Sequence, residues 1–304
     1  MLPNFLIIGA QKSATTFVHH CLSEHPSVFM PLEEIPFFED PDYSQSNLES
    51  LEKLFEGASR QKTVGIKRPN YLHKPECPER IYKHVPSARL IAILRDPLER
   101  AISAYYHYAR MGFAPIRHVN EGLLEILNNG PAKQYPRSAE IIEFGFYHKH
   151  LSRYLNYFDN KQMLIMLYDD IMKDSLDSLK KVFKFLEIDE EYVPQSLNSR
   201  PQSGVYSIPR LRLRTLRNPI VYTYSSDQMR LFPKEEIGLL GSTIAKVINR
   251  IDSRVLSRVF SNARPSLSRD LTEALSAIYK EDTSKLEELL GLSLAHWKVF
   301  YASD

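Results

Sequence analysis

Short, nearly continuous apolar runs bounded by polar or turn-forming residues recur along the chain. They cover residues 5–8, 63–67, 88–94 and 163–167, with a shorter run at 28–30. Apolar runs of this length are typical of strands in a parallel sheet that is covered on both faces. Segments with helical spacing alternate with them, at 17–22, 48–55, 79–84, from 97 onwards, 138–158 and 176–186. The alternation predicts an α/β fold with a central parallel sheet flanked by helices.

The length and composition fit one domain over residues 1–304, with a basic, lid-like segment at about 194–217 and a helical part at about 233–304. The 39 basic and 37 acidic residues give a net charge of +2, which shows no basic excess for a nucleic-acid partner. The two cysteines, Cys21 and Cys77, are too few for a disulfide framework and fit a reducing compartment. No apolar run approaches the roughly 20 residues that span a bilayer, and the first strand leaves no room for a signal peptide. We therefore expect a cytoplasmic protein with neither a nucleic-acid nor a membrane partner. The sequence pattern does not indicate whether the chain is a monomer or an oligomer.

The first predicted strand leads into a loop with the composition of an anion site. Gly9 breaks the strand, residues 11–13 are Gln-Lys-Ser, and Thr15 and Thr16 open the next helix. Free backbone N–H groups and the positive end of the helix dipole attract an anion at such a place. The P-loop pattern G-x-x-x-x-G-K-[ST] has a glycine where this chain has Ala14, and its lysine comes later. This departure argues against a standard ATPase or kinase, and the alternative is that Lys12 is only a solvated lysine.

An acidic and aromatic segment follows the short run at 28–30. Glu33 and Glu34 precede Phe37 and Phe38, at the carboxyl end of a strand, where α/β folds place their chemistry. A carboxylate desolvated by such aromatic rings has a raised pKa and can act as a base near neutral pH. The alternative is an acidic surface loop whose phenylalanines pack in the core.

Basic residues follow two further strands. Lys67 and Arg68 end the run at 63–67, and Arg95 ends the run at 88–94. A helix should begin at Pro97, which places Ser103 about two turns inside it. Arg95 can then hold an anion bidentately with help from the Ser103 hydroxyl. The alternative for Arg95 is an ion pair with Asp96 or Glu99.

Four segments, in this order, resemble motifs of the sulfotransferase superfamily that uses 3'-phosphoadenosine 5'-phosphosulfate (PAPS). The segments are GAQKSATT, EEIPFF, GIKRPNYL and RDPLERAISAYYH. They are similar to K-x-G-T-T, K-E-x-x-F-F, E-K-x-P-x-Y and R-N-P-x-x-R-x-x-S-x-Y of the bacterial and heparan-sulfate branch. The resemblance implies a fold like that of P-loop nucleotide kinases, PAPS as cofactor with 3',5'-ADP as product, and no metal.

The resemblance also implies roles for individual residues. Glu34 matches the base, Lys12 the lysine that stabilises the leaving phosphate, and Lys67 a lysine that assists at the sulfuryl group. Arg95 and Ser103 match the pair that grips the 3'-phosphate, and Tyr168 matches a tyrosine near the adenine. The full set implied for cofactor binding is Gln11, Lys12, Ser13, Ala14, Thr15, Thr16, Arg95, Ser103, Tyr168, and, from the lid-like segment, Ser207 and Arg210.

Two departures from the family pattern bear on the acceptor. Position 33 is Glu where the polysaccharide branch usually has Lys, and position 66 is Ile where it usually has Glu. The acidic residues of this segment would repel an anionic glycan; they are Glu33, Glu34, Glu39, Asp40 and Asp42. Our hypothesis is a small neutral or cationic acceptor, such as a saxitoxin-type alkaloid of cyanobacterial natural-product biosynthesis. The alternatives are a heparan-like glycan sulfotransferase, a P-loop small-molecule kinase and a non-catalytic nucleotide-binding module.

Overall fold

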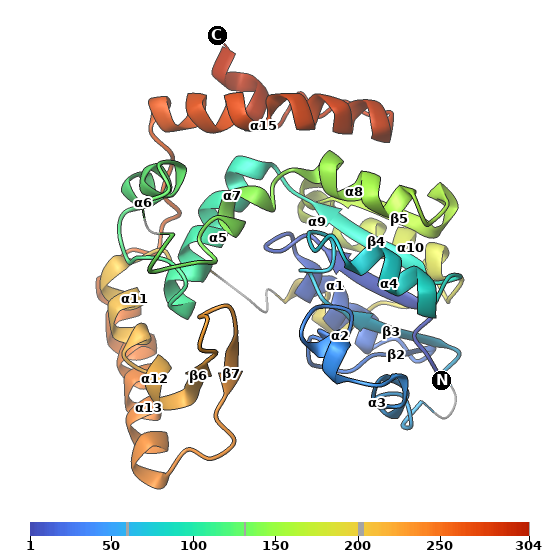
Figure 1. Cartoon of the computed structure of the whole chain (residues 1–304), viewed down its shortest axis with the longest axis horizontal. Helices are drawn as coiled ribbons and strands as arrows, with labels where there is room; N and C mark the ends of the chain where they lie inside the picture. The colour runs from blue at the N-terminus through green and yellow to red at the C-terminus, as the bar shows by residue number, and fades with distance from the viewer. Residues whose placement is uncertain (59–60, 131, 200–203, 304) are drawn as a thin grey trace. The chain divides into compact units, whose positions relative to one another are not determined.

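A parallel β-sheet forms the centre of the computed structural model, which describes residues 1–58, 61–130, 132–199 and 204–303. Its five strands lie in the order β2-β3-β1-β4-β5, and every neighbouring pair is parallel (Figure 1). The strands are β1 Phe5–Gly9, β2 Val28–Phe29, β3 Thr63–Lys67, β4 Arg89–Leu94 and β5 Met163–Leu167. The predicted α/β class and the positions of all five strands are confirmed.

The packing of the chain divides it into two compact units, each made of several segments. The first comprises Met1–Asp96, Phe146–Gln202 and Asp282–Leu292, and the second comprises Pro97–Gly145, Ser203–Glu281 and Ser293–Asp304. The whole parallel sheet belongs to the first unit. The single domain that the sequence predicts stays a prediction, and the two units are described separately.

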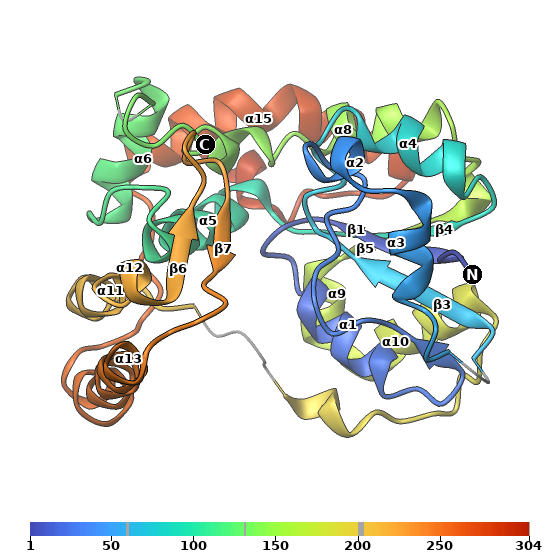
Figure 2. The ribbon, with the colours of Figure 1, turned by 60° about the horizontal axis from the view of Figure 1, so that its bottom comes forward.

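In the first unit, helices cover both faces of the sheet (Figure 2). One face carries α1 Thr15–Ser23 and α10 Ser175–Leu186, and the other carries α4 Cys77–His84 and α8 Tyr147–Leu155. The shorter elements of this unit are α2 Asp42–Gln45, α3 Leu48–Lys53, η1 Asn160–Gln162, α9 Tyr168–Lys173 and η2 Gln195–Asn198. Because β1 and β4 are central strands, the loops that follow them are held by a covered sheet.

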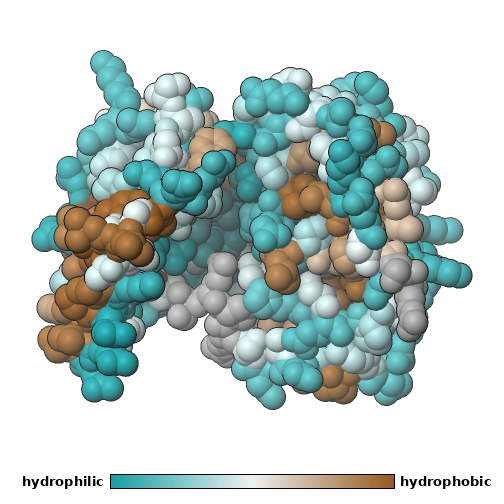
Figure 3. All heavy atoms as spheres, turned by 90° about the horizontal axis from the view of Figure 1, so that it is seen from below, coloured by the Kyte–Doolittle hydropathy of each residue, from teal (hydrophilic) through white to brown (hydrophobic). Residues whose placement is uncertain are grey.

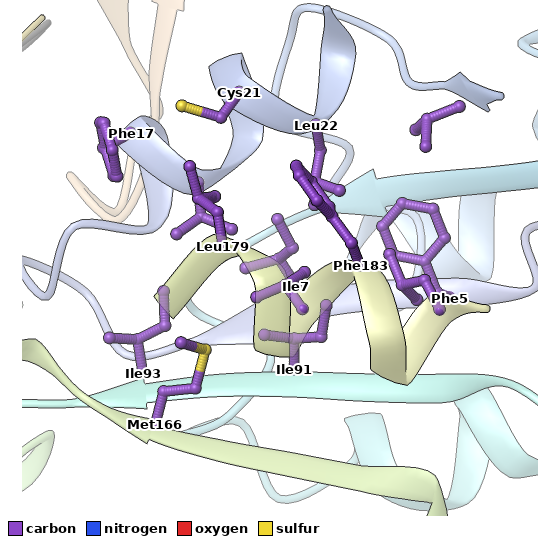
Figure 4. Packing of buried hydrophobic residues seen from close by; sticks show 14 of the residues in the cluster. Phe5, Ile7, Phe17, Cys21, Leu22, Ile91, Ile93, Met166, Leu179 and Phe183 are labelled. Carbon is purple, nitrogen blue, oxygen red and sulfur yellow. The ribbon is translucent and has the colours of Figure 1, made fainter. Parts of the chain in front are cut away.

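A buried hydrophobic cluster joins the sheet to α1 and α10 (Figure 4). Alternate residues of a strand face the same side, so Ile7 of β1 and Ile91 of β4 meet Leu22 of α1 and Phe183 of α10 there. Each such buried side chain contributes about 1.5–3 kcal/mol. The cluster therefore fixes the start of α1, and with it the loop that precedes α1.

Both cysteines are free and buried. Burial raises the pKa of Cys21 to about 12, which makes its thiol a poor nucleophile. That Cys21 and Cys77 do not bond to each other agrees with the expectation that the chain has no disulfide framework. Separately, none of the described helices combines the length and hydrophobicity that crossing a bilayer requires.

The second unit is mainly helical. Its elements are α5 Pro97–Met111, α6 Val119–Leu127, α7 Glu140–Glu143, α11 Ile208–Thr215, α12 Asn218–Val221, the antiparallel strands β6 Tyr222–Tyr224 and β7 Leu231–Pro233, α13 Leu239–Ile251, the π-helical turn η3 Asp252–Leu256, α14 Ser257–Val259 and η4 Lys298–Ser303. The long helix α15 Arg269–Leu290 begins in this unit. Carboxylates of this unit bind arginines of distant segments: the partly buried Glu99 pairs with Arg264, and the buried Asp252 pairs with Arg210.

One prediction from the sequence needs correction. The single helix expected over 138–158 is wrong, because α7 and α8 are separated by residues 144–146. A Cβ atom at Gly145 would lie 2.7 Å from the Tyr279 ring, so only glycine fits there, and glycine weakens a helix. The lid-like segment at about 194–217 contains the helical elements η2 and α11. Residues 200–203 of that segment lie outside the described residues.

Candidate active site

The loop between β1 and α1 has an unusual backbone. Lys12 and Ala14 both have left-handed conformations, with φ of 69° and 66°. Backbone N–H groups converge in turns that include such residues and form a concavity for an anion. The Ala10 N–H donates to the Ile93 carbonyl at 2.8 Å, which ties the loop to β4. The α1 N-terminus at Thr15 then supplies further N–H groups. The loop backbone therefore has a shape that can accept an anion, and the binding itself stays a prediction.

Polar atoms in this loop are buried without a protein partner. Ser13 is completely buried, yet its Oγ makes no hydrogen bond within the described structure, and the same holds for Gln11 Oε1. Buried polar atoms in folded proteins almost always have a partner. A phosphate-like group in the loop would provide one for the Ser13 hydroxyl. The loop residues thus fit an anionic ligand, on the evidence of their own unsatisfied hydrogen-bonding capacity.

Arg95 lies against this loop. Its Nη1 donates to the Lys12 carbonyl at 3.2 Å, and its guanidinium lies 4.2 Å from the centre of the Tyr168 ring. Arg95 follows β4 and Tyr168 follows β5, and the carboxyl ends of neighbouring parallel strands lie at one edge of the sheet. Two residues predicted to bind the cofactor are therefore close to the loop and to each other.

Lys67 connects the loop segment to the acidic segment. Its Nζ donates to Thr16 Oγ1 at 3.2 Å and lies 3.1 Å from Glu34 Oε1. Only 4% of the Lys67 side chain is exposed, and a buried cation requires such partners. Three residues predicted separately from three motifs thus form one cluster at the end of β3.

Backbone contacts hold Glu34 in this place. The Ile35 N–H donates to the Lys67 carbonyl at 3.2 Å. The Tyr71 hydroxyl donates to the Ile35 carbonyl and accepts from the Phe38 N–H. Burial raises the pKa of Tyr71 well above its usual value, so the hydroxyl keeps its proton. These hydrogen bonds therefore anchor the backbone that directly follows Glu34.

The aromatic residues of this segment belong to the core, as the alternative interpretation predicted. Phe37 and Phe38 are buried and pack edge to face against each other. Glu34, in contrast, keeps 40% of its side chain exposed and lies beside the cations of Lys67 and Arg68. The expectation that aromatic rings desolvate the candidate base is wrong for Glu34. Ion pairs with the two cations orient it instead.

Sequence reasoning missed a buried ion pair next to the candidate base. Arg68 binds Glu39 bidentately, at 2.7 and 2.8 Å, and its Nη1 lies 3.3 Å from Glu34 Oε2. Burial opposes the charged form of Arg68, but the hydrogen bonds and charge of Glu39 outweigh it and raise the pKa of Arg68. The two residues are 29 positions apart, so no local pattern indicated the pair. Glu39 thereby fixes the arginine that contacts Glu34.

His19 of α1 also borders the cluster and was not predicted. It is buried, and its Nε2–H donates to the Pro31 carbonyl at 2.9 Å. Burial, and secondly the charge of Lys67, lowers the pKa of His19 to about 4. The ring is therefore neutral near neutral pH and supports the backbone before the acidic segment.

The remaining predicted site residues belong to the second unit. Ser103 is buried within α5, and Ser207 is buried at the N-cap of α11. Arg210 donates to the buried Asp252 at 2.7 and 3.0 Å, so its guanidinium is already engaged. The roles of these three residues in cofactor binding stay predictions. Among the described residues, no group of three or more His, Cys, Asp or Glu side chains is arranged to hold a metal.

A covered parallel sheet with an anion-binding loop after its central strand defines the P-loop-like class of α/β folds. The chain matches the family model described as "Sulfotransferase domain" over residues 2–287. It therefore belongs to the sulfotransferase family, and the resemblance inferred from the four motifs is confirmed.

Individual relatives agree with this assignment. Mouse bifunctional heparan sulfate N-deacetylase/N-sulfotransferase 4 is 31% identical over 217 residues, which are 67% of this chain and 24% of the relative. Mouse heparan sulfate glucosamine 3-O-sulfotransferase 5 is 28% identical over 207 residues, 68% of this chain and 60% of the relative. The chain thus spans only part of the length of these curated relatives. A solved sulfotransferase from Alicyclobacillus acidocaldarius has a TM-score of 0.67 at 20% identity, covering 98% of this chain and 99% of that one, which supports the fold.

Proposed function

We propose that this chain transfers a sulfuryl group from PAPS to a hydroxyl or amine of a small acceptor and releases 3',5'-ADP. The observation that carries the proposal is the position of Lys67, whose Nζ lies within 3.2 Å of both Thr16 and Glu34. One cation thereby joins the anion-binding segment to the carboxylate that matches the family base. Donor and acceptor sites must adjoin in this way for an in-line transfer.

The residues that would hold PAPS follow from the motif matches and the loop geometry. Residues 11–16 would bind the 5'-phosphosulfate, Arg95 and Ser103 the 3'-phosphate, and Tyr168 would lie near the adenine. Ser207 and Arg210 remain candidates, the latter supported less because Asp252 already engages it. When bound, PAPS supplies an activated sulfuryl group and a leaving phosphate on which negative charge develops.

The chain's own residues can then perform two tasks. Lys12 neutralises charge at the leaving phosphate, and a preorganised donor of this kind typically contributes about 3 kcal/mol to lowering the barrier. Glu34 accepts the proton from the acceptor's hydroxyl or amine, while Lys67 and Arg68 hold its two carboxylate oxygens. Positive charge in this scheme comes from lysine and arginine.

The acceptor proposed is a small neutral or cationic molecule, and saxitoxin-type alkaloids remain one candidate class. The support is narrower than the sequence suggested, since Glu39 is neutralised by Arg68 and Asp40 pairs with Arg80 at 2.6 Å. Glu33, which is exposed beside Glu34, is therefore the main residue expected to attract a cationic acceptor and repel an anionic one. A heparan-like glycan is the second candidate, favoured by the similarity of this chain to the two mouse heparan sulfate sulfotransferases. A cytoplasmic location also remains part of the proposal, supported by the two free cysteines.

The reaction is tested by incubating the purified protein with radiolabelled PAPS and a panel of cationic, neutral and glycan acceptors. The proposal predicts label transfer that Glu34→Gln lowers about 100-fold or more in kcat, with 3',5'-ADP binding retained. Exposed Glu121 of α6 offers a matched control, Glu121→Gln, which should leave kcat unchanged. Phosphoryl transfer from Mg-ATP to the same panel, with no transfer from PAPS, would establish the kinase alternative instead.

The acceptor class is tested by Glu33→Lys. We expect this change to raise KM for cationic acceptors roughly ten-fold, since about 1.4 kcal/mol of charge interaction corresponds to ten-fold in affinity. Efficient sulfation of heparan-type oligosaccharides by the unmodified protein, with no response of cationic acceptors to Glu33→Lys, would contradict the cationic proposal. That result would leave the sulfotransferase activity itself intact.

A further inference from the structure

A row of apolar side chains lies exposed along α13 and the helical turns that follow it. Its members, called the α13 stripe below, are Leu239, Leu240, Ile244, Val247, Ile251, Val255 and Val259. Leu239 is 91% exposed, Leu240 75% and Val259 68%. Spacings of three and four residues bring most of the stripe to one side of a helix. Figure 3 shows hydrophobic side chains gathered on this part of the surface beside hydrophilic ones.

The stripe is a second apolar face, separate from the one that α13 contributes to its own unit. Ala245 and Ile248 are buried, and the buried Asp252 binds Arg210 and Arg214 at 2.7 and 3.0 Å. The helix is therefore already fixed in place without the stripe. Scattered exposed apolar residues need no explanation, but a contiguous patch indicates an interaction surface.

A row of basic residues runs beside the stripe. Its members recur every four residues and are all exposed: Lys246, Arg250, Arg254 and Arg258. None of them forms an ion pair within the described part of the chain. Within α13, at about 100° per residue, Lys246 and Arg250 lie next to the stripe, on the side away from Ala245 and Ile248. The single acidic residue within 239–260 is the buried Asp252, and Glu235 and Glu236 precede the first turn of α13.

We propose that the α13 stripe and its basic row bind an anionic lipid surface, with α13 lying in the plane of the interface. A helix with one exposed apolar face and a flanking basic row, without exposed acidic residues, has the chemistry of an interfacial membrane helix. This proposal departs from the expectation that the protein has no membrane partner. It concerns the surface of a bilayer and no crossing of it.

A second copy of the chain fits this face less well. An antiparallel two-fold pairing places the same surface of each copy against the other. The two basic rows would then lie along the same edge of the interface, where like charges repel. An anionic surface satisfies the apolar stripe and the basic row together.

The test is flotation of the purified full-length chain with phosphatidylcholine vesicles that contain or lack phosphatidylglycerol. The proposal predicts binding to the anionic vesicles that weakens as salt is raised. Arg250→Gln and Arg254→Gln should each reduce this binding about five-fold. The double change Leu240→Gln with Val247→Gln should reduce it on the order of 100-fold, because the buried apolar groups drive insertion.

Matched controls lie elsewhere in the same unit. Lys133→Gln removes an exposed charge, and Leu124→Gln removes a residue that is 53% exposed on α6; neither should alter binding. No flotation with anionic vesicles at low salt would overturn the proposal. So would equal flotation of the stripe variants and the unmodified chain. A concentration-dependent dimer in sedimentation that Leu240→Gln with Val247→Gln abolishes, without lipid binding, would assign the face to a second copy.

Discussion

Two regions of this protein, the end of β3 and the surface of α13, use lysine and arginine in opposite ways. In the first, Lys67 and Arg68 are largely buried and each contacts the carboxylate of Glu34. In the second, the basic row beside α13 is exposed and forms no ion pair within the described residues. The same residue types are therefore fixed parts of a site in one place and a solvated surface in the other. Their partners, more than their number, determine what they do.

The largest effect that we expect is a loss of stability when Arg68, one of the buried cations, is replaced. Arg68→Met leaves the carboxylate of Glu39 buried without its partner, because the Glu39 side chain is only 5% exposed. Removing one member of a buried pair typically costs about 3–5 kcal/mol in the free energy of unfolding. Chemical denaturation measures this loss.

The matched control combines both members of the pair. Arg68→Met together with Glu39→Gln removes the unpaired charge and should recover much of the lost stability. The exposed Arg250→Met should change stability by less than about 0.5 kcal/mol. Similar losses for Arg68→Met and Arg250→Met would remove the distinction between the two regions.

The second effect concerns catalysis and Lys12. Lys12→Ala should lower kcat for sulfuryl transfer about 100-fold or more, because the proposed reaction would lose a cation that stabilises the leaving phosphate. Lys62→Ala, at an exposed position before β3, should have no effect on kcat. Steady-state kinetics with PAPS measures both, and equal rates for the two variants would exclude Lys12 from the reaction.

The third effect is on stability at acidic pH. Burial and the charge of Lys67 lower the pKa of His19 from 6.5 to about 4. Between these values the unfolded chain binds a proton that the folded chain does not, so the free energy of unfolding falls as the pH drops from about 6.5 to 4. The loss approaches about 2–3 kcal/mol and is absent above this range.

Two neighbouring histidines make the experiment internally controlled. His19→Gln keeps a donor for the Pro31 carbonyl and should flatten the pH dependence, whereas His20→Gln, partly exposed, should leave it unchanged. Denaturation curves across this pH range for the three proteins compare the slopes. An unchanged slope in His19→Gln would show that other groups cause the acid sensitivity.

The smallest expected effect is on the free energy of unfolding and concerns the backbone conformation of Ala14 in the loop. Ala14 has φ of 66°, a conformation that costs a residue with a Cβ atom roughly 1 kcal/mol. Ala14→Gly should therefore raise the free energy of unfolding by up to about 1 kcal/mol. Ala277→Gly, at an exposed position inside α15, should lower it instead. Thermal unfolding measures both changes, and destabilisation by Ala14→Gly would contradict the assigned backbone.

The sheet and the strand–loop–helix connection after β1 were predictable because their signals are local. The apolar runs that became β1, β3, β4 and β5 are interrupted by turn-forming or charged residues at their ends. Parallel pairing then places the following loops at one edge, which is why Lys12, Arg95 and Tyr168 come together. Here local pattern and topology determine the result.

The unpredicted features depend on contacts between distant segments. The Arg68–Glu39 pair joins residues 29 positions apart, and the break between α7 and α8 depends on Tyr279 occupying the space beside Gly145. Helical spacing over 138–158 gave no sign of that contact. The net charge of the acidic segment could not be predicted for the same reason. Composition alone does not show that Arg68 and Arg80 neutralise part of that charge.

Calorimetric titration with 3',5'-ADP measures whether the loop after β1 binds the phosphosulfate end of PAPS. We expect the unmodified protein to bind 3',5'-ADP, Lys12→Ala to weaken this binding while Lys62→Ala does not, and Mg-ATP not to bind. Tight binding of Mg-ATP without binding of 3',5'-ADP, or equal 3',5'-ADP affinities for Lys12→Ala and the unmodified protein, would contradict this expectation.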